Sequence, residues 1–168
     1  MAMTKSLLGL TTLVIWLTAC AGDVPPAGET PGASGAPLSI GAGVPFADVE
    51  GEVHLRNVRQ LTTDGENAEA YFSFDGSRLV FQRNTAGGCD QIYTMQLATG
   101  AVNPVSNGQG RTTCSYYFPS GDKVLYSSTH LHDAACPPPP DYSRGYVWPI
   151  YEGYDIFVAN EDGSGTTQ

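Results

Sequence analysis

The chain has 168 residues, which is room for one ordinary domain, and carries 8 basic against 17 acidic side chains, a formal net charge of −9. An acidic surface repels phosphate backbones and anionic lipid headgroups. The charge therefore argues against nucleic acid as a partner and against peripheral binding to an anionic membrane.

Residues 1–19 predict a signal for export. Lys5 supplies a positive start, and the apolar stretch Leu7–Leu17 follows it. Eleven residues are too few to cross a hydrocarbon core of about 30 Å as a helix, which needs roughly 20. This length fits the apolar region of a secretory signal peptide.

The next four residues, Leu17-Thr18-Ala19-Cys20, resemble the lipobox of bacterial lipoproteins, whose cysteine is acylated and becomes the new N-terminus. The resemblance implies a lipid on Cys20 as the chain's only contact with a membrane. Ala21 replaces the aspartate linked to retention in the inner membrane, which implies the periplasmic side of the outer membrane. An ordinary secretory peptide with an incidental cysteine is the alternative.

Residues 20–52 predict a flexible tether that starts at the lipidated cysteine. Its first part, residues 21–45, is rich in Gly, Pro, Ala and Ser and has almost no large apolar side chain. Such a segment cannot bury enough surface to offset the entropy lost on ordering. A coil of about 25 residues spans roughly 25–30 Å and would lift the following domain, residues 53–168, off the lipid.

From Val53 onward, short runs of β-branched and aromatic residues alternate with glycine turns such as Asp75-Gly76 and Ser120-Gly121. Strands of about six residues joined in this way predict antiparallel hairpins in an all-β fold. The expected strands are Leu55–Leu61, Glu69–Phe74, Arg78–Arg83, Gln91–Gln96, Asn103–Ser106, Cys114–Phe118, Lys123–Ser128 and Tyr154–Ala159.

An internal repeat organises these strands. Residues 71–81 match residues 116–126 at a spacing of 45, close to the 40–45-residue period of propeller blades. Residues 90–95 match residues 154–159 at a spacing of 64, so the second unit has an insertion within residues 129–153. The repeat therefore predicts about two four-stranded units.

Residues 72–81, 90–95 and Gln60-Leu61-Thr62 resemble the TolB-type, or WD40-like, β-propeller repeat. Phe74 departs from the usual proline and Ser120 from the usual aspartate. The resemblance implies antiparallel four-stranded blades in an incomplete ring, since closed propellers have typically 4–8 blades. The strand Leu55–Leu61 would then complete a last blade. We expect an N-terminal fragment of a longer protein, or else a short protein whose copies complete the ring.

Three cysteines follow Cys20. In a propeller blade, the loops that hold Cys89 and Cys136 and the start of the strand at Cys114 lie on one face, and clustered cysteines form disulfides in an oxidising compartment. We expect Cys114–Cys136, which would fix the insertion to its own blade, with Cys89–Cys114 close behind.

The insertion holds the candidate partner-binding residues. His130, His132 and Cys136 have ligand chemistry that suits zinc, but loop histidines beside a structural disulfide are the favoured interpretation, and no metal site is predicted. Four prolines, Pro137–Pro140, stiffen the segment. A patch for a partner would comprise His130, His132, Tyr142, Tyr146, Trp148 and Tyr151. Alternatively, the aromatic side chains pack down on the blade.

No catalytic motif is apparent in the sequence, and we expect no cofactor. The expected function is that of a non-catalytic envelope lipoprotein, which presents a propeller face to an envelope protein, peptide or glycan. The alternative is the N-terminal propeller of an exported peptidase whose catalytic domain lies outside this chain.

Overall fold

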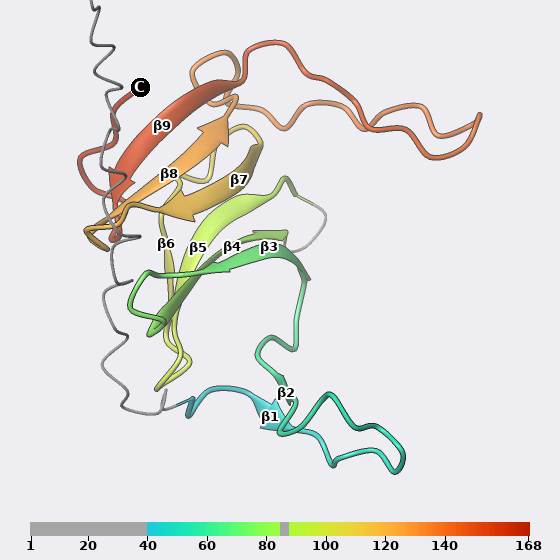
Figure 1. Ribbon diagram of the computed structural model, residues 1–168. Coiled ribbons are helices and arrows are strands. Elements are labelled where there is room, and N and C mark those ends of the chain that lie inside the picture. Colours follow the sequence, from blue (N-terminus) through green and yellow to red (C-terminus); the bar gives the residue numbers. More distant parts are fainter. Residues whose placement is uncertain (1–39, 85–87) are drawn as a thin grey trace, which may run out of the picture. The chain divides into compact units, whose positions relative to one another are not determined.

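The computed structural model describes residues 40–84 and 88–168 (Figure 1). These residues form nine β-strands, all paired antiparallel, and no helix. The predicted all-β class with antiparallel sheets is therefore confirmed. The signal peptide, Cys20 and the tether as far as residue 39 lie outside the described residues.

The first sheet is a four-stranded meander. It comprises β3 (Glu66–Phe72), β4 (Arg78–Asn84), β5 (Gln91–Gln96) and β6 (Val102–Pro104), hydrogen-bonded in that order. The turn from β3 to β4 follows from its sequence, because Gly76 adopts a positive φ of 71° and Asp75 accepts hydrogen bonds from Ser73 and Ser77. These bonds lower the pKa of Asp75 to about 2.

The second sheet repeats this arrangement with β7 (Thr112–Tyr117), β8 (Lys123–Ser128) and β9 (Asp155–Asn160). A single bridge joins Val158 to Thr167, which is the place that β6 takes in the first sheet. The pairing registers also repeat: Phe72 faces Leu79, and Tyr117, 45 residues later, faces Val124. The sequence repeat is therefore a structural repeat.

Both inner strands contain a bulge at the same place in the repeat. Register shifts fall between Ala68 and Tyr71 in β3 and between Thr113 and Tyr116 in β7. Glu69 and Cys114 lie at these bulges with φ values of 50° and 49°, a region that side chains other than glycine enter rarely.

The main core lies between the two sheets. Val80 and Ile92 of the first sheet pack in one cluster with Tyr126 and Phe157 of the second. Tyr126 and Phe157 also stack on each other with ring centroids 5.9 Å apart. Each sheet therefore buries an apolar face by covering the other, as expected for repeat units that cannot bury this face alone.

The leading segment, residues 41–62, differs from the prediction. The expected strand Leu55–Leu61 is reduced to β2 (Arg59–Gln60), which pairs with β1 (Val44–Pro45) inside the expected tether. Ala42 is buried and its N–H donates to the carbonyl of Leu97 at 2.9 Å. The segment was predicted to be flexible because it has few large apolar side chains. Its small residues nevertheless let the backbone hydrogen-bond to the chain directly after β5.

The other strands lie close to their predicted bounds. β5 and β8 match to the residue, whereas β3, β6 and β7 begin earlier than expected and β9 begins and ends one residue later. Strand ends are set by hydrogen bonds to the neighbouring strand, which side-chain alternation alone does not fix.

A repeat-matched pair of substitutions tests whether the contact between the sheets stabilises the fold. Ile92 is fully buried, whereas Ile156, its equivalent in the second sheet, is 63% exposed. Ile92→Ala should lower the free energy of unfolding by about 2–5 kcal/mol because it leaves a cavity. Ile156→Ala should change it by less than about 0.5 kcal/mol. Urea denaturation followed by circular dichroism measures both, and equal losses would show that this contact does not stabilise the fold.

Candidate functional site

The connection between β8 and β9, residues 129–154, projects from the second sheet, and we call it the arm (Figure 1). It contains neither strand nor helix. The predicted insertion at residues 129–153 thus coincides with one continuous excursion of the chain.

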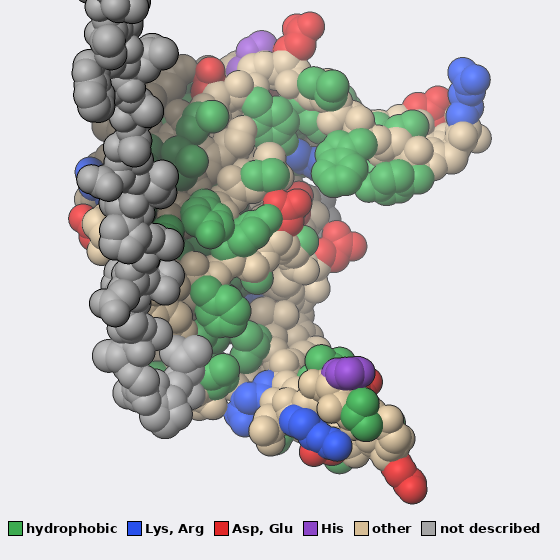
Figure 2. Space-filling view, in the orientation of Figure 1, with side chains coloured by type: hydrophobic (Ala, Val, Ile, Leu, Met, Phe, Trp, Pro, Cys, Tyr) green, Lys and Arg blue, Asp and Glu red, His purple; other side chains and the backbone are tan. Residues whose placement is uncertain are grey.

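Apolar side chains are exposed along the arm, as the space-filling view shows (Figure 2). Trp148 is 79% exposed and Ile150 97%, and Tyr142, Tyr146 and Val147 are exposed with them. The alternative that the aromatic residues pack down over the sheet is therefore wrong for Tyr142, Tyr146 and Trp148. These three members of the predicted patch lie together on the projecting part of the arm.

Tyr151 lies at the base of the arm. Its hydroxyl donates to the carbonyl of Pro138 at 3.1 Å, which ties the two sides of the arm together. The guanidinium of Arg111 lies 5.4 Å from the centre of its ring, within the range of a cation–π contact. Tyr151 therefore anchors the arm and is only partly available to a partner.

The two histidines also lie at the base. The His130 ring packs 4.3 Å from that of Phe157, its Nδ1 lies 2.8 Å from the Ser128 hydroxyl, and burial lowers its pKa. The His132 ring packs against Gly153, where a Cβ would approach it to 2.3 Å. The His130 side chain packs against the second sheet and that of His132 against Gly153 of the arm, whereas the exposed aromatic residues lie on the projecting part. Among the described residues, no group of three His, Cys, Asp or Glu side chains is placed to hold a metal ion.

A disulfide joins Cys89, between β4 and β5, to Cys136 in the arm, with Cα atoms 5.6 Å apart. It connects the first sheet to the base of the arm across a sequence separation of 47. Bonds of this kind persist in oxidising compartments, which indicates a protein that folds outside the cytoplasm.

The expected pairings Cys114–Cys136 and Cys89–Cys114 are both wrong, because Cys114 is a free, exposed thiol. The physical reason is that β7 begins at Thr112. Cys114 is therefore two residues inside the strand, at the bulge, instead of at its first residue as predicted.

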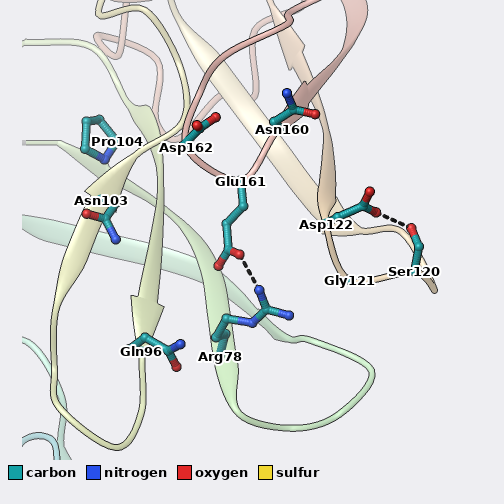
Figure 3. A pocket seen from close by; sticks show the side chains of 10 residues that line it. All are labelled: Arg78, Gln96, Asn103, Pro104, Ser120, Gly121, Asp122, Asn160, Glu161 and Asp162. Carbon is teal, nitrogen blue, oxygen red and sulfur yellow. Dashed lines mark hydrogen bonds and ion pairs between the residues drawn. The ribbon is translucent and has the colours of Figure 1, made fainter.

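Sequence reasoning missed a polar cavity of about 870 Å³ at the opposite ends of the strands, beside the β3–β4 and β7–β8 turns. Arg78 and Glu161 point toward each other inside it and form an ion pair (Figure 3). The Tyr117 hydroxyl also donates to Glu161, at 3.1 Å, and burial and then the Glu161 charge raise the pKa of Tyr117. Because Arg78 starts β4 and Glu161 follows β9, these contacts join the two sheets.

Three carboxylates, those of Asp122, Glu161 and Asp162, line this cavity together with amide side chains. No histidine, cysteine or lysine lines it. Asp122 accepts a hydrogen bond from Ser120, which lowers its pKa, so it is ionised at neutral pH. The cavity thus offers charge and hydrogen-bond acceptors, and its one hydroxyl, that of Ser120, bonds to Asp122 within the β7–β8 turn.

No family model matches the chain, and no curated protein matches it. Among solved structures, one of a protein from Agrobacterium tumefaciens assigned as TolB aligns with a TM-score of 0.45 and 20% identity. The alignment covers 61% of this chain and 32% of that one, so the chain spans under a third of the length of that protein. No helix among the described residues is long and apolar enough to cross a membrane.

Removing the disulfide should loosen the arm and destabilise the fold. A cross-link that closes a loop of this length contributes about 2–4 kcal/mol, so Cys136→Ser should lower the free energy of unfolding by that amount. Trypsin should then cut faster after Arg144, in the middle of the arm. Cys114→Ser is the matched control, since that thiol is free. Equal trypsin rates for the two variants would mean that the disulfide does not order the arm.

Proposed function

We propose that this chain is a non-catalytic binding module of the bacterial cell envelope, built as part of a TolB-like β-propeller and anchored by a lipid on Cys20. Its arm binds a protein partner. The observation that carries this proposal is the set of exposed aromatic and aliphatic side chains on an arm that is fixed at its base.

The arm combines two properties of protein-binding surfaces: exposed aromatic and aliphatic side chains, and a backbone that is restricted before binding. Trp and Tyr contribute most of the binding energy at many protein interfaces. Covering apolar surface yields about 25 cal/mol per Å², so side chains such as Ile150 gain by being covered. The prolines and the disulfide restrict the arm before binding, which lowers the entropy lost when a partner holds it.

A protein or peptide suits the arm better than a glycan or a nucleic acid. Val147 and Ile150 are exposed aliphatic side chains, which neither stack on a sugar ring nor hydrogen-bond to its hydroxyls. The net charge of −9 opposes nucleic acid.

The propeller assignment rests on the repeat itself. The two sheets share strand order, pairing register and bulge position, with their first two strands spaced by 45 residues and their third strands by 64. The non-catalytic assignment rests on the two places where catalytic residues could gather, the base of the arm and the polar cavity. His130 packs against the second sheet, and the one hydroxyl of the polar cavity, that of Ser120, bonds to a turn carboxylate with no histidine or lysine among the lining residues.

The lipid anchor is tested by labelling. Cells that produce the chain and are fed a fatty acid with a terminal alkyne should incorporate it into the protein. Cys20→Ser should abolish the label and release the protein from the membrane fraction. A secreted protein that carries no label in its native form would exclude the anchor.

Binding through the arm is tested by photo-crosslinking in the envelope. A photoreactive phenylalanine in place of Tyr146 should form one discrete adduct. Trp148→Ala should weaken this adduct at least about fivefold, because removing a central aromatic contact typically costs more than 1 kcal/mol.

The same photoreactive group in place of Gln109, an exposed residue between β6 and β7, is the control and should give no such adduct. The absence of any adduct at position 146, or equal adducts at both positions, would contradict a partner-binding role for the arm.

A further inference from the structure

The outer face of the second sheet repeats a face that is covered in the first sheet. Val80 and Ile92 are fully buried between the sheets. Their equivalents in the repeat are Leu125 and Ile156, which point away from the first sheet, and Ile156 is 63% exposed. We call the surface formed by Leu125, Ile156 and Val158 the open face. It has the same pairing register as the covered face of the first sheet and is likewise apolar, but none of the described sheets packs against it.

A second uncovered apolar face lies on the leading segment. β1 and β2 pair Val44 with Gln60, and the N–H of Phe46 bonds to the carbonyl of Val58, so Val44, Phe46 and Val58 share one side of this ribbon. All three are exposed, with Phe46 at 55%. We call this surface the ribbon face.

The ribbon is held next to the side of the first sheet that faces away from the second. Leu61, directly after β2, packs against Leu79 and Phe81, and Arg59 donates to the carbonyl of Ala42, itself bonded to the sheet. The layers therefore follow the order leading segment, first sheet, second sheet. Because the first sheet separates the ribbon from the second sheet, the ribbon face cannot cover the open face of its own chain.

We infer that the open face of one copy of this chain binds the ribbon face of a second copy. In this contact, the leading segment of one copy would pack on the second sheet of another, so the layers of the two copies would form one continuous stack. It joins two different surfaces and is therefore heterologous, so successive copies close into a ring or extend as a filament. Both surfaces consist of antiparallel β-strands that present apolar side chains, exposed at Ile156 and partly exposed at Leu125 and Val158 on the open face, which suits face-to-face packing of β layers.

Sedimentation velocity of the full chain, produced in a bacterium and purified in a mild detergent, tests this inference. The native protein should form concentration-dependent oligomers. Ile156→Lys places a charge on the open face, and Phe46→Lys places one on the ribbon face. Each variant alone should sediment as a monomer. Because both side chains are more than half exposed, the variants should keep the native circular dichroism spectrum.

Mixing the two variants gives the decisive result. The intact open face of the Phe46→Lys copy should bind the intact ribbon face of the Ile156→Lys copy, and a dimer with one copy of each should form without larger species. Leu131→Lys, at a side chain 62% exposed and outside both faces, is the matched control and should assemble as the native protein does. A monomeric native protein, or a mixture that stays monomeric while the native protein assembles, would overturn the inference. Either outcome leaves the proposed role of the arm untouched.

Discussion

The structure depends on one constraint: a sheet of this repeat cannot shield both of its faces. Val80 and Ile92 are removed from water only because the second sheet supplies Tyr126 and Phe157. The polar contacts at the two ends of the interface follow from that packing. Arg78 reaches Glu161 at one end, and at the other Thr112 bonds through its N–H to the carbonyl of Asp90 at 3.0 Å. The sheets are thus aligned by their apolar centre and held in register by polar contacts at its edges.

The same constraint separates what was predictable from what was not. β5 and β8 were located to the residue because alternating apolar side chains and Gly turns are local signals. The bulges at Glu69 and Cys114 were missed, since no local signal marks a non-glycine residue at positive φ. The disulfide pairing was missed for a related reason. It depends on which loops meet in space, and a shift of two residues at the start of β7 is enough to remove Cys114 from that meeting point.

The candidate site shows a similar division. The insertion and its aromatic residues were predicted from the interrupted repeat, because the second unit is longer than the first by the length of the insertion. Their separate roles were not apparent, since Tyr151, His130 and His132 differ from Tyr146 and Trp148 only in what they contact. The cavity around Arg78 and Glu161 gave no signal at all, because its residues come from five separated turns and strand ends.

The disulfide also determines how the molecule responds to mechanical load. The bond between Cys89 and Cys136 encloses β5, β6, β7 and β8 in a covalent loop. A force applied from the N-terminal side can peel away the leading segment, β3 and β4, but at Cys89 it passes through the sulfur atoms directly to Cys136. The chain between them, about 160 Å long when fully extended, is therefore spared from stretching. In a protein pulled from its N-terminal end, the segment from β5 to β8 would be spared extension, and the load would pass along the arm to β9.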